Sequence, residues 1–172
     1  MSEDNIRMFR DNHGCRRFVG KNAIVTAGTA GIGLAACHRL CSEGARVFLC
    51  SRKQDNVDEA VKELQSKYGK DFAAGVPCNV TKPGDLENFI QAAQKYFNGK
   101  IHIVVSNVGV NPTISKIVDM SESIYDKLFE ANVRSHWKLI KLVTPHLVHQ
   151  ESSILLVSFF KISNDVIRGV IN

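Results

Sequence analysis

The sequence predicts an α/β fold, a doubly wound parallel sheet that is truncated after about five strands. Short runs of β-branched and apolar residues alternate with longer segments of helical periodicity along most of the 172 residues. Strands separated by helices are joined by crossover connections, which give a parallel sheet with helices on both faces. A glycine-rich turn follows the first of these strands, where such a fold passes from strand to helix.

The first half of the chain carries three predicted strands, at 23–26, 46–51 and 72–76. A helix over 31–43 is expected to end at Gly44 and to turn five apolar side chains inward: Ile32, Leu34, Ala35, Ala36 and Leu40. A helix over 56–67 has four apolar residues at i, i+3, i+4 and i+7 on one face: Val57, Ala60, Val61 and Leu64.

The second half continues the alternation. A helix over 83–97 is expected to bury five side chains: Leu86, Phe89, Ile90, Ala93 and Phe97. The strand at 101–105 is apolar almost without alternation, as strands covered on both faces are. A long helix over 121–147, with Ser121 as its cap and Pro145 weakening its end, precedes a last strand at 154–157.

Length and composition indicate one ordinary globular domain. We divide the chain into an N-terminal extension (1–15), the domain (16–158) and a divergent tail (159–172). No apolar run approaches the roughly 20 residues of a membrane span, and 1–15 lacks the apolar core of a signal peptide. The net charge of +5 is scattered and not interleaved with aromatic residues, so we expect neither a nucleic-acid nor a membrane partner.

The five cysteines are odd in number, which favours a reducing compartment and a cytoplasmic location. Cys37 and Cys41 share a helical face beside His38, and His146 and His149 form an i, i+3 pair. Neither pair has a third ligand at metal-binding spacing. We therefore predict no metal site and interpret the cysteines as small buried hydrophobic residues.

The glycine-rich turn at 26–33 carries the strongest functional signal. Glycines there let the backbone approach a pyrophosphate, and the following helix offers free N–H groups and a positive dipole end. The predicted binding residues of this turn are Thr26, Gly28, Thr29, Gly31, Ile32 and Gly33. The alternative is a tight turn of structural importance only. A P-loop at 14–21 is excluded, because its spacing is one residue too long and it precedes a strand.

The end of the second strand indicates which nucleotide is bound. An NAD-preferring domain places an acidic residue there for the ribose hydroxyls, whereas this chain has Ser51, Arg52 and Lys53. A guanidinium suits a 2′-phosphate, so NADP(H) is the predicted cofactor. The alternative is a pair of solvated surface charges. The missing carboxylate also argues against a methyltransferase.

These residues resemble the short-chain dehydrogenase/reductase family, which has a Rossmann fold. Thr26, Gly31 and Gly33 match the family's Thr-Gly-x-x-x-Gly-x-Gly loop, with Ala27 at its first glycine. Other matches are Asn107 and Gly109 of the Asn-Asn-Ala-Gly motif, Asn79-Val80 at the family's Asp-Val, and the active-site asparagine Asn132. The resemblance implies that Asn79 meets the adenine and that Asn132 holds a water in a proton relay.

Several segments are more narrowly similar to a peroxisomal branch of the family, the NADPH-dependent carbonyl and retinal reductases. These segments are 51–54, 56–58, 105–107, 110–112 and 125–127. The resemblance implies NADPH-dependent reduction of a small-molecule ketone or aldehyde. The peroxisomal Ser-x-Leu-type ending is absent, because the chain ends in Gly169-Val170-Ile171-Asn172.

The resemblance ends near Ser158. The family's catalytic serine falls on Phe159, and no Tyr-x-x-x-Lys motif follows Asn132. A match at Tyr96 to Lys100 is not a substitute, because Gly99 is expected to end that helix. The break suggests read-through into an intron. We expect a chain that is inactive by itself; the alternative is a non-catalytic nucleotide-binding or heterodimerising module.

Overall fold

The computed structural model describes residues 16–111, 117–148 and 152–157. The predicted extension 1–15, the tail 159–172, and Ser158 and His149 lie outside these ranges. The strands are β1 (Asn22–Thr26), β2 (Arg46–Ser51), β3 (Ala73–Pro77), β4 (Ile103–Ser106) and β5 (Ser153–Leu156). The helices are α2 (Gly31–Ser42), α3 (Gln54–Tyr68), α4 (Asp85–Phe97), α5 (Glu122–Phe129) and α6 (Ser135–Val143).

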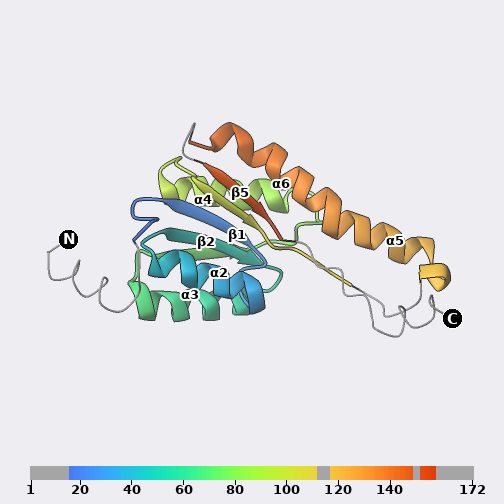
Figure 1. The fold of residues 1–172 in the computed structure, drawn as a ribbon, viewed down its shortest axis with the longest axis horizontal. Helices are drawn as coiled ribbons and strands as arrows, with labels where there is room; N and C mark the ends of the chain where they lie inside the picture. Colours follow the sequence, from blue (N-terminus) through green and yellow to red (C-terminus); the bar gives the residue numbers. More distant parts are fainter. Residues whose placement is uncertain (1–15, 112–116, 149–151, 158–172) are drawn as a thin grey trace, which may run out of the picture.

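The five strands form one parallel sheet in the order β3-β2-β1-β4-β5. Helices α2 and α3 cover one face of this sheet, and α4 with α6 covers the other (Figure 1). The strand order reverses direction between β1 and β4. In doubly wound sheets, ligands bind beyond the carboxyl ends of the strands at this reversal. The predicted fold class is therefore confirmed, and it locates the place to look for a site.

Two of the helix faces agree with the periodicity of the sequence, and one does not. All five residues predicted to turn inward from α4 are buried, and in α3 the buried residues include Val57, Ala60 and Leu64. The prediction for α2 is wrong in part, because Ile32 is 49% exposed and Ala35 is exposed. Of the other predicted residues, Leu40 is buried, and Leu34 and Ala36 are partly buried against the core. Gly33, Cys37 and Cys41 complete the buried stripe of α2.

The reason for the rotated face of α2 is a close approach at its first turn. A Cβ atom at Gly33 would lie 2.1 Å from the carbonyl oxygen of Ala27, so only glycine allows this contact. Because Gly33 faces the glycine turn, the residues four, seven and eight positions further along α2 face the sheet. These residues are Cys37, Leu40 and Cys41. Ile32 is consequently directed outward, toward the end of the sheet.

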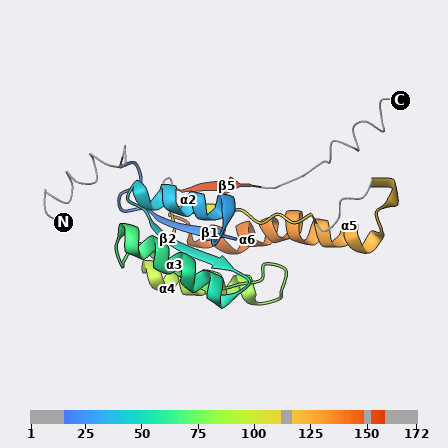
Figure 2. The same cartoon turned by 90° about the horizontal axis from the view of Figure 1, so that it is seen from below.

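The long helix predicted over 121–147 is one continuous rod with two internal changes of geometry. A π-helical segment, η2 (Glu130–Arg134), separates α5 from α6, and a 3₁₀ turn, η3 (Thr144–His146), contains Pro145. Another 3₁₀ turn, η1 (Ile117–Asp119), precedes α5. The extra residue of the π turn rotates the following side chains, and Asn132, Ser135 and His136 are buried. Figures 1 and 2 show that α5 extends past the sheet.

The last strand, β5, is an exposed edge in the described part of the chain. It pairs with β4, and Ile154, Leu155 and Leu156 are 40%, 55% and 52% exposed. Among the described residues, no helix is long and apolar enough to cross a membrane.

Candidate functional site: a cleft at the carboxyl ends of the strands

A cleft of about 1130 Å³ opens where β1, β2, β3 and β4 end, at the reversal of the strand order. Its walls come from the turns after these four strands and from the α5–η2 helix. The lining residues are Ala27, Thr29, Ala30, Ile32, Ser51, Arg52, Lys53, Asn56, Cys78, Asn79, Val80, Thr81, Asn107, Val108, Gly109, Val110, Lys127, Glu130 and Ala131. The cleft thus contains nine of the predicted cofactor-binding residues and lies beside the N-terminus of α2.

The glycines of the turn have different physical roles. Gly28 and Gly33 are packed against their neighbours, since a Cβ at Gly28 would lie 2.9 Å from the Cβ of Leu49. Gly31 has φ +53° and open space around it, so its requirement is the left-handed backbone. Thr26 is also buried, and its Oγ1 accepts a hydrogen bond of 3.0 Å from the Asn107 N–H. These four residues shape the turn, whereas Thr29 and Ile32 face the cleft.

Ala27 occupies the position of the family's first glycine with φ +50°, a region that L-residues rarely adopt. The adjoining first turn of α2 holds no acidic residue and no side-chain cap. Its N–H groups and the positive end of the helix dipole are thus available to an anion. The turn and helix together form a suitable place for a pyrophosphate.

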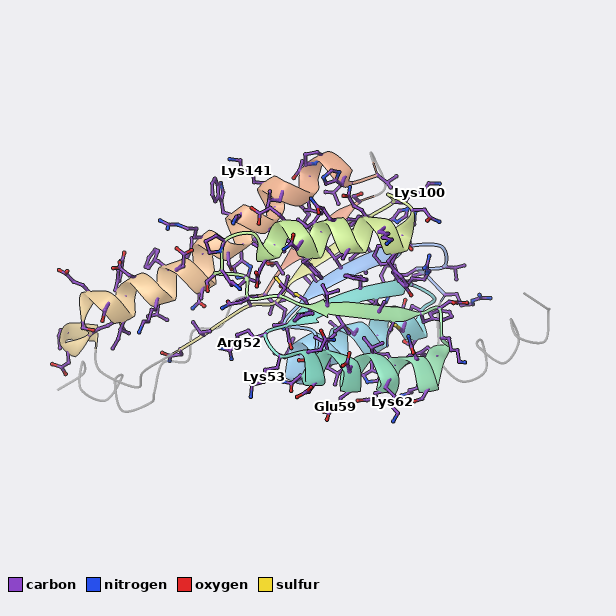
Figure 3. The ribbon with its side chains drawn as sticks, turned by 180° about the vertical axis from the view of Figure 1, so that it is seen from behind. Arg52, Lys53, Glu59, Lys62, Lys100 and Lys141 are labelled. Atoms are coloured by element: carbon purple, nitrogen blue, oxygen red, sulfur yellow. The ribbon has the colours of Figure 1, made fainter. Side chains whose placement is uncertain are left out.

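The end of β2 supplies positive charge to the cleft. Arg52 and Lys53 are exposed and lie at the end of the sheet where the strands terminate (Figure 3). Ser51 is partly buried, and its Oγ donates a hydrogen bond of 3.4 Å to the Lys53 carbonyl. Among the described lining residues, only Glu130 is acidic, and it comes from the opposite wall. The β2 side of the cleft therefore favours an anionic group.

The turn after β3 is ordered by Asn79. Its Oδ1 accepts hydrogen bonds from the Thr81 N–H (3.3 Å) and Oγ1 (2.9 Å), and its own N–H donates to Asp85 Oδ2 (2.9 Å). The side-chain Nδ2 of Asn79 is the group that remains for contact with a base, in a wall shared with the partly buried Val80.

The buried thiols of α2 and β2 are unreactive, because their raised pKa values disfavour the thiolate. Burial raises the pKa of Cys41 to about 12, and it raises the pKa of Cys37 further. A hydrogen bond with Cys78, together with burial, raises the pKa of the Cys50 thiol. These four cysteines are buried free thiols, as expected, and no cluster of metal-binding side chains occurs among the residues described.

Asn107, after β4, presents an unsatisfied acceptor at the floor of the cleft. The residue is only 9% exposed, and its Nδ2 donates a hydrogen bond of 3.4 Å to the Ala27 carbonyl. Its Oδ1 is buried and has no hydrogen-bond partner among the described residues. A buried acceptor without a donor costs roughly 1–3 kcal/mol, so a ligand that donates to it would be stabilised here. Gly109 borders the same floor and is exposed.

Asn132 is buried on the π segment, and its side-chain amide forms hydrogen bonds with both backbone polar groups of Val110. Oδ1 accepts from the Val110 N–H (2.8 Å), and Nδ2 donates to the Val110 carbonyl (2.9 Å). Both side-chain polar atoms are thus occupied by the loop after β4. The sequence did not reveal that Lys127 and Glu130 border the cleft, because their exposed positions on a helix carry no distinguishing pattern.

A parallel sheet with this strand order, a glycine turn at α2 and a cleft at the reversal define a dinucleotide-binding α/β domain. A family model described as short chain dehydrogenase matches residues 21–161. The chain therefore belongs to the short-chain dehydrogenase family. The resemblance seen in the sequence motifs is confirmed.

Comparisons with individual proteins agree with this family. Dehydrogenase/reductase SDR family member 4 of Caenorhabditis elegans is 45% identical over 136 residues, which cover 79% of this chain and 52% of that protein. Among solved structures, a double mutant of a Serratia marcescens short-chain dehydrogenase/reductase has a TM-score of 0.73 at 26% identity, over 81% of this chain and 55% of that one.

A second solved structure, a point mutant of actinorhodin polyketide ketoreductase with NADPH, has a TM-score of 0.67 at 28% identity. The match covers 73% of this chain and 47% of the ketoreductase. The chain thus spans about half the length of the relatives it matches.

Proposed function

We propose that this chain is the NADP(H)-binding part of a short-chain dehydrogenase/reductase whose lineage reduces small-molecule ketones or aldehydes, as carbonyl and retinal reductases do. The observation that carries the proposal is the composition of the cleft. Its β2 side has Arg52 and Lys53 without a carboxylate, and its floor has the unpartnered Asn107 Oδ1. An anionic dinucleotide with a 2′-phosphate and ribose hydroxyl donors matches both features.

Different residues of the cleft would bind different parts of the cofactor. The glycine turn and the α2 N-terminus would hold the pyrophosphate, Ser51 and Arg52 the 2′-phosphate, and Asn79 and Val80 the adenine. Asn107 and Gly109 would meet the ribose nearer the nicotinamide. When bound, the cofactor supplies a hydride for a carbonyl carbon.

Carbonyl reduction also needs a proton for the developing alkoxide, and a positioned acid typically contributes 10²–10⁴-fold. Asn132 uses its amide to fix the loop at Val110, so its side chain positions the site and donates no proton. The 172 residues contain no tyrosine after Tyr125. We therefore propose that they bind cofactor without reducing carbonyl compounds by themselves. We also propose a reducing, cytoplasmic setting, which the free thiols of the described cysteines suit.

The test combines binding with turnover on the purified chain. Calorimetric titration should show NADPH binding more tightly than NADH. The loss of NADPH absorbance with a reactive dicarbonyl should stay at the rate without protein. Equal affinity for both cofactors would overturn the cofactor assignment, and turnover above background that disappears in Asn132→Ala would overturn the proposed inactivity.

A further inference from the structure

The loop that follows β4 is held by two side chains from the helix behind it. Asn132 and His136 are four residues apart, on the π segment and on α6, and both are buried at 7% and 5% exposure. Asn132 binds the backbone of Val110, as described above. His136 contacts the same loop two residues earlier. The loop residues Val108, Gly109 and Val110 present their other side to the cleft.

The imidazole of His136 bridges this loop and the end of β4. Its Nε2 lies 2.9 Å from the Val108 carbonyl oxygen, and its Nδ1 lies 2.5 Å from Ser106 Oγ. A carbonyl oxygen only accepts, so Nε2 carries the hydrogen and donates it. Nδ1 then accepts from the hydroxyl of Ser106, which is 1% exposed.

The neutral ring satisfies both partners with one donor and one acceptor. Burial lowers the pKa of His136 below its usual 6.5, which favours this neutral form. The loop is fixed on its other flank by the Asn107 N–H, which donates to Thr26 Oγ1. The segment 106–110 is therefore anchored from β1, from the π segment and from α6. The anchor on Val108 comes from His136.

We infer that His136 is a positioning residue for the cofactor cleft, because its Nε2–H fixes the Val108 carbonyl and so sets the floor on which the cofactor rests. This inference rests on the proposed NADP(H) binding. The Val108 contact carries the effect, since Val108 lines the cleft. The Ser106 contact is at the end of β4 and serves the stability of the fold.

Two conservative substitutions separate these contacts. The amide nitrogen of His136→Gln can reach the position of Nε2 and donate to Val108, whereas the shorter side chain of His136→Asn can reach only the position of Nδ1. His136→Ala loses both contacts. Ser135→Ala is the matched control, because its buried hydroxyl donates to the Ala131 carbonyl (2.6 Å) within the same helix and does not touch the loop.

The dissociation constant for NADPH and the thermal midpoint should be measured for all four variants. We expect His136→Ala and His136→Asn to bind NADPH about five- to tenfold more weakly, and His136→Gln to restore most of the affinity. Ser135→Ala should lower the thermal midpoint and leave the affinity unchanged. Affinities that follow the thermal midpoint across the four variants would overturn the inference.

Hydrogen exchange of the loop without cofactor distinguishes this inference from the proposed function. The Val110 amide, which donates to Asn132, should lose protection in His136→Ala and His136→Asn and keep it in His136→Gln. If the unmodified chain binds no cofactor while this exchange pattern holds, NADP(H) binding fails and the role of His136 in fixing the loop stands. Unchanged protection in all three variants would refute that role.

Discussion

At the residue scale, we propose that cofactor choice depends on Arg52. It is exposed at the end of β2, lines the cleft and forms no ion pair with another described residue. Replacing it by aspartate places a carboxylate where an NAD-preferring domain has one. We expect Arg52→Asp to lose the preference for NADPH over NADH, with a loss of about 1.5–3 kcal/mol in NADPH binding. Calorimetry with both cofactors measures this.

The control for this experiment is Lys62→Asp, which makes the same change of charge on the outer face of α3 (Figure 3). Its effect on NADPH affinity should be small and should disappear with added salt, because screened surface charges act weakly over distance. An equal loss of affinity in both variants would mean that net charge, and not the contact with Arg52, determines the preference.

The glycine turn at 26–33 is strained at Ala27. Its φ of +50° is unfavourable for alanine, and glycine adopts this conformation without a steric penalty. We expect Ala27→Gly to raise the free energy of unfolding by about 0.5–1 kcal/mol, measured by urea denaturation. Ala35→Gly makes the same chemical change at an exposed position of α2 and should lower it by about 1 kcal/mol. Destabilisation by both changes would contradict the strain.

At the scale of elements, the C-terminus of α2 is tied to the segment before β1 by a buried carboxylate. The side chain of Glu43 is fully buried between Arg17 (2.5 and 2.6 Å) and Arg39 (2.5 Å). Hydrogen bonds from Arg17, and then from Arg39, lower its pKa from 4.5 to about 2 despite the opposing effect of burial.

A carboxylate whose pKa is lower in the folded state stabilises the fold above its unfolded pKa. The stabilisation by Glu43 is therefore complete above about pH 5 and is lost as the pH falls from 4.5 toward 2. Glu43→Gln should be less stable at neutral pH and should lose less stability on acidification, measured by denaturant unfolding at several pH values. Glu59→Gln, on the exposed face of α3, is the control. Parallel pH curves for Glu43→Gln and the unmodified chain would refute this assignment.

The sequence predicted elements well where a broad apolar face packs on the sheet. The buried faces of α3 and α4 follow directly from their periodicity, since large side chains there drive packing. The face of α2 was predicted wrongly at Ile32, because close contact at Gly33 outweighs the apolar character of Ile32. The π turn at Glu130–Arg134 contains no glycine or proline from which it could be predicted, and its geometry arises from packing.

The candidate site was predictable in its loops and not on its helix. Glycines and charges that follow a strand meet at one edge of a parallel sheet, so the positions of Thr29, Arg52 and Asn107 could be inferred from the order of the elements. The contact of His136 with Val108 depends on the rotation introduced by the π turn. A rotation of this kind cannot be read from residue spacing.

At the scale of the whole molecule, the outer face of the α5–η2–α6 rod is apolar, and none of the described residues covers it. Tyr125, Phe129, Val133 and Trp137 recur every four residues and are 48–58% exposed. A groove of about 810 Å³ runs along this stripe. The adjoining row of charged residues is acidic in its first half and basic in its second: Glu122, Asp126, Glu130, Arg134 and Lys138. Glu130 pairs with Arg134 (2.8 Å) and Lys138 with Glu87 (3.2 Å) within the chain, so the apolar stripe is the stronger argument. Two such rods packed antiparallel would cover both stripes.

We therefore expect this chain to self-associate through the rod. Val133→Glu places a charge at the centre of the stripe and should shift the protein toward monomer in sedimentation velocity, because burying the new carboxylate opposes association. Val118→Glu, at a position 82% exposed on η1, is the matched control and should leave the distribution unchanged. If Leu155→Glu on β5 dissociates the assembly while Val133→Glu does not, the exposed sheet edge and not the rod is the contact. A chain that stays monomeric at every concentration would contradict both surfaces.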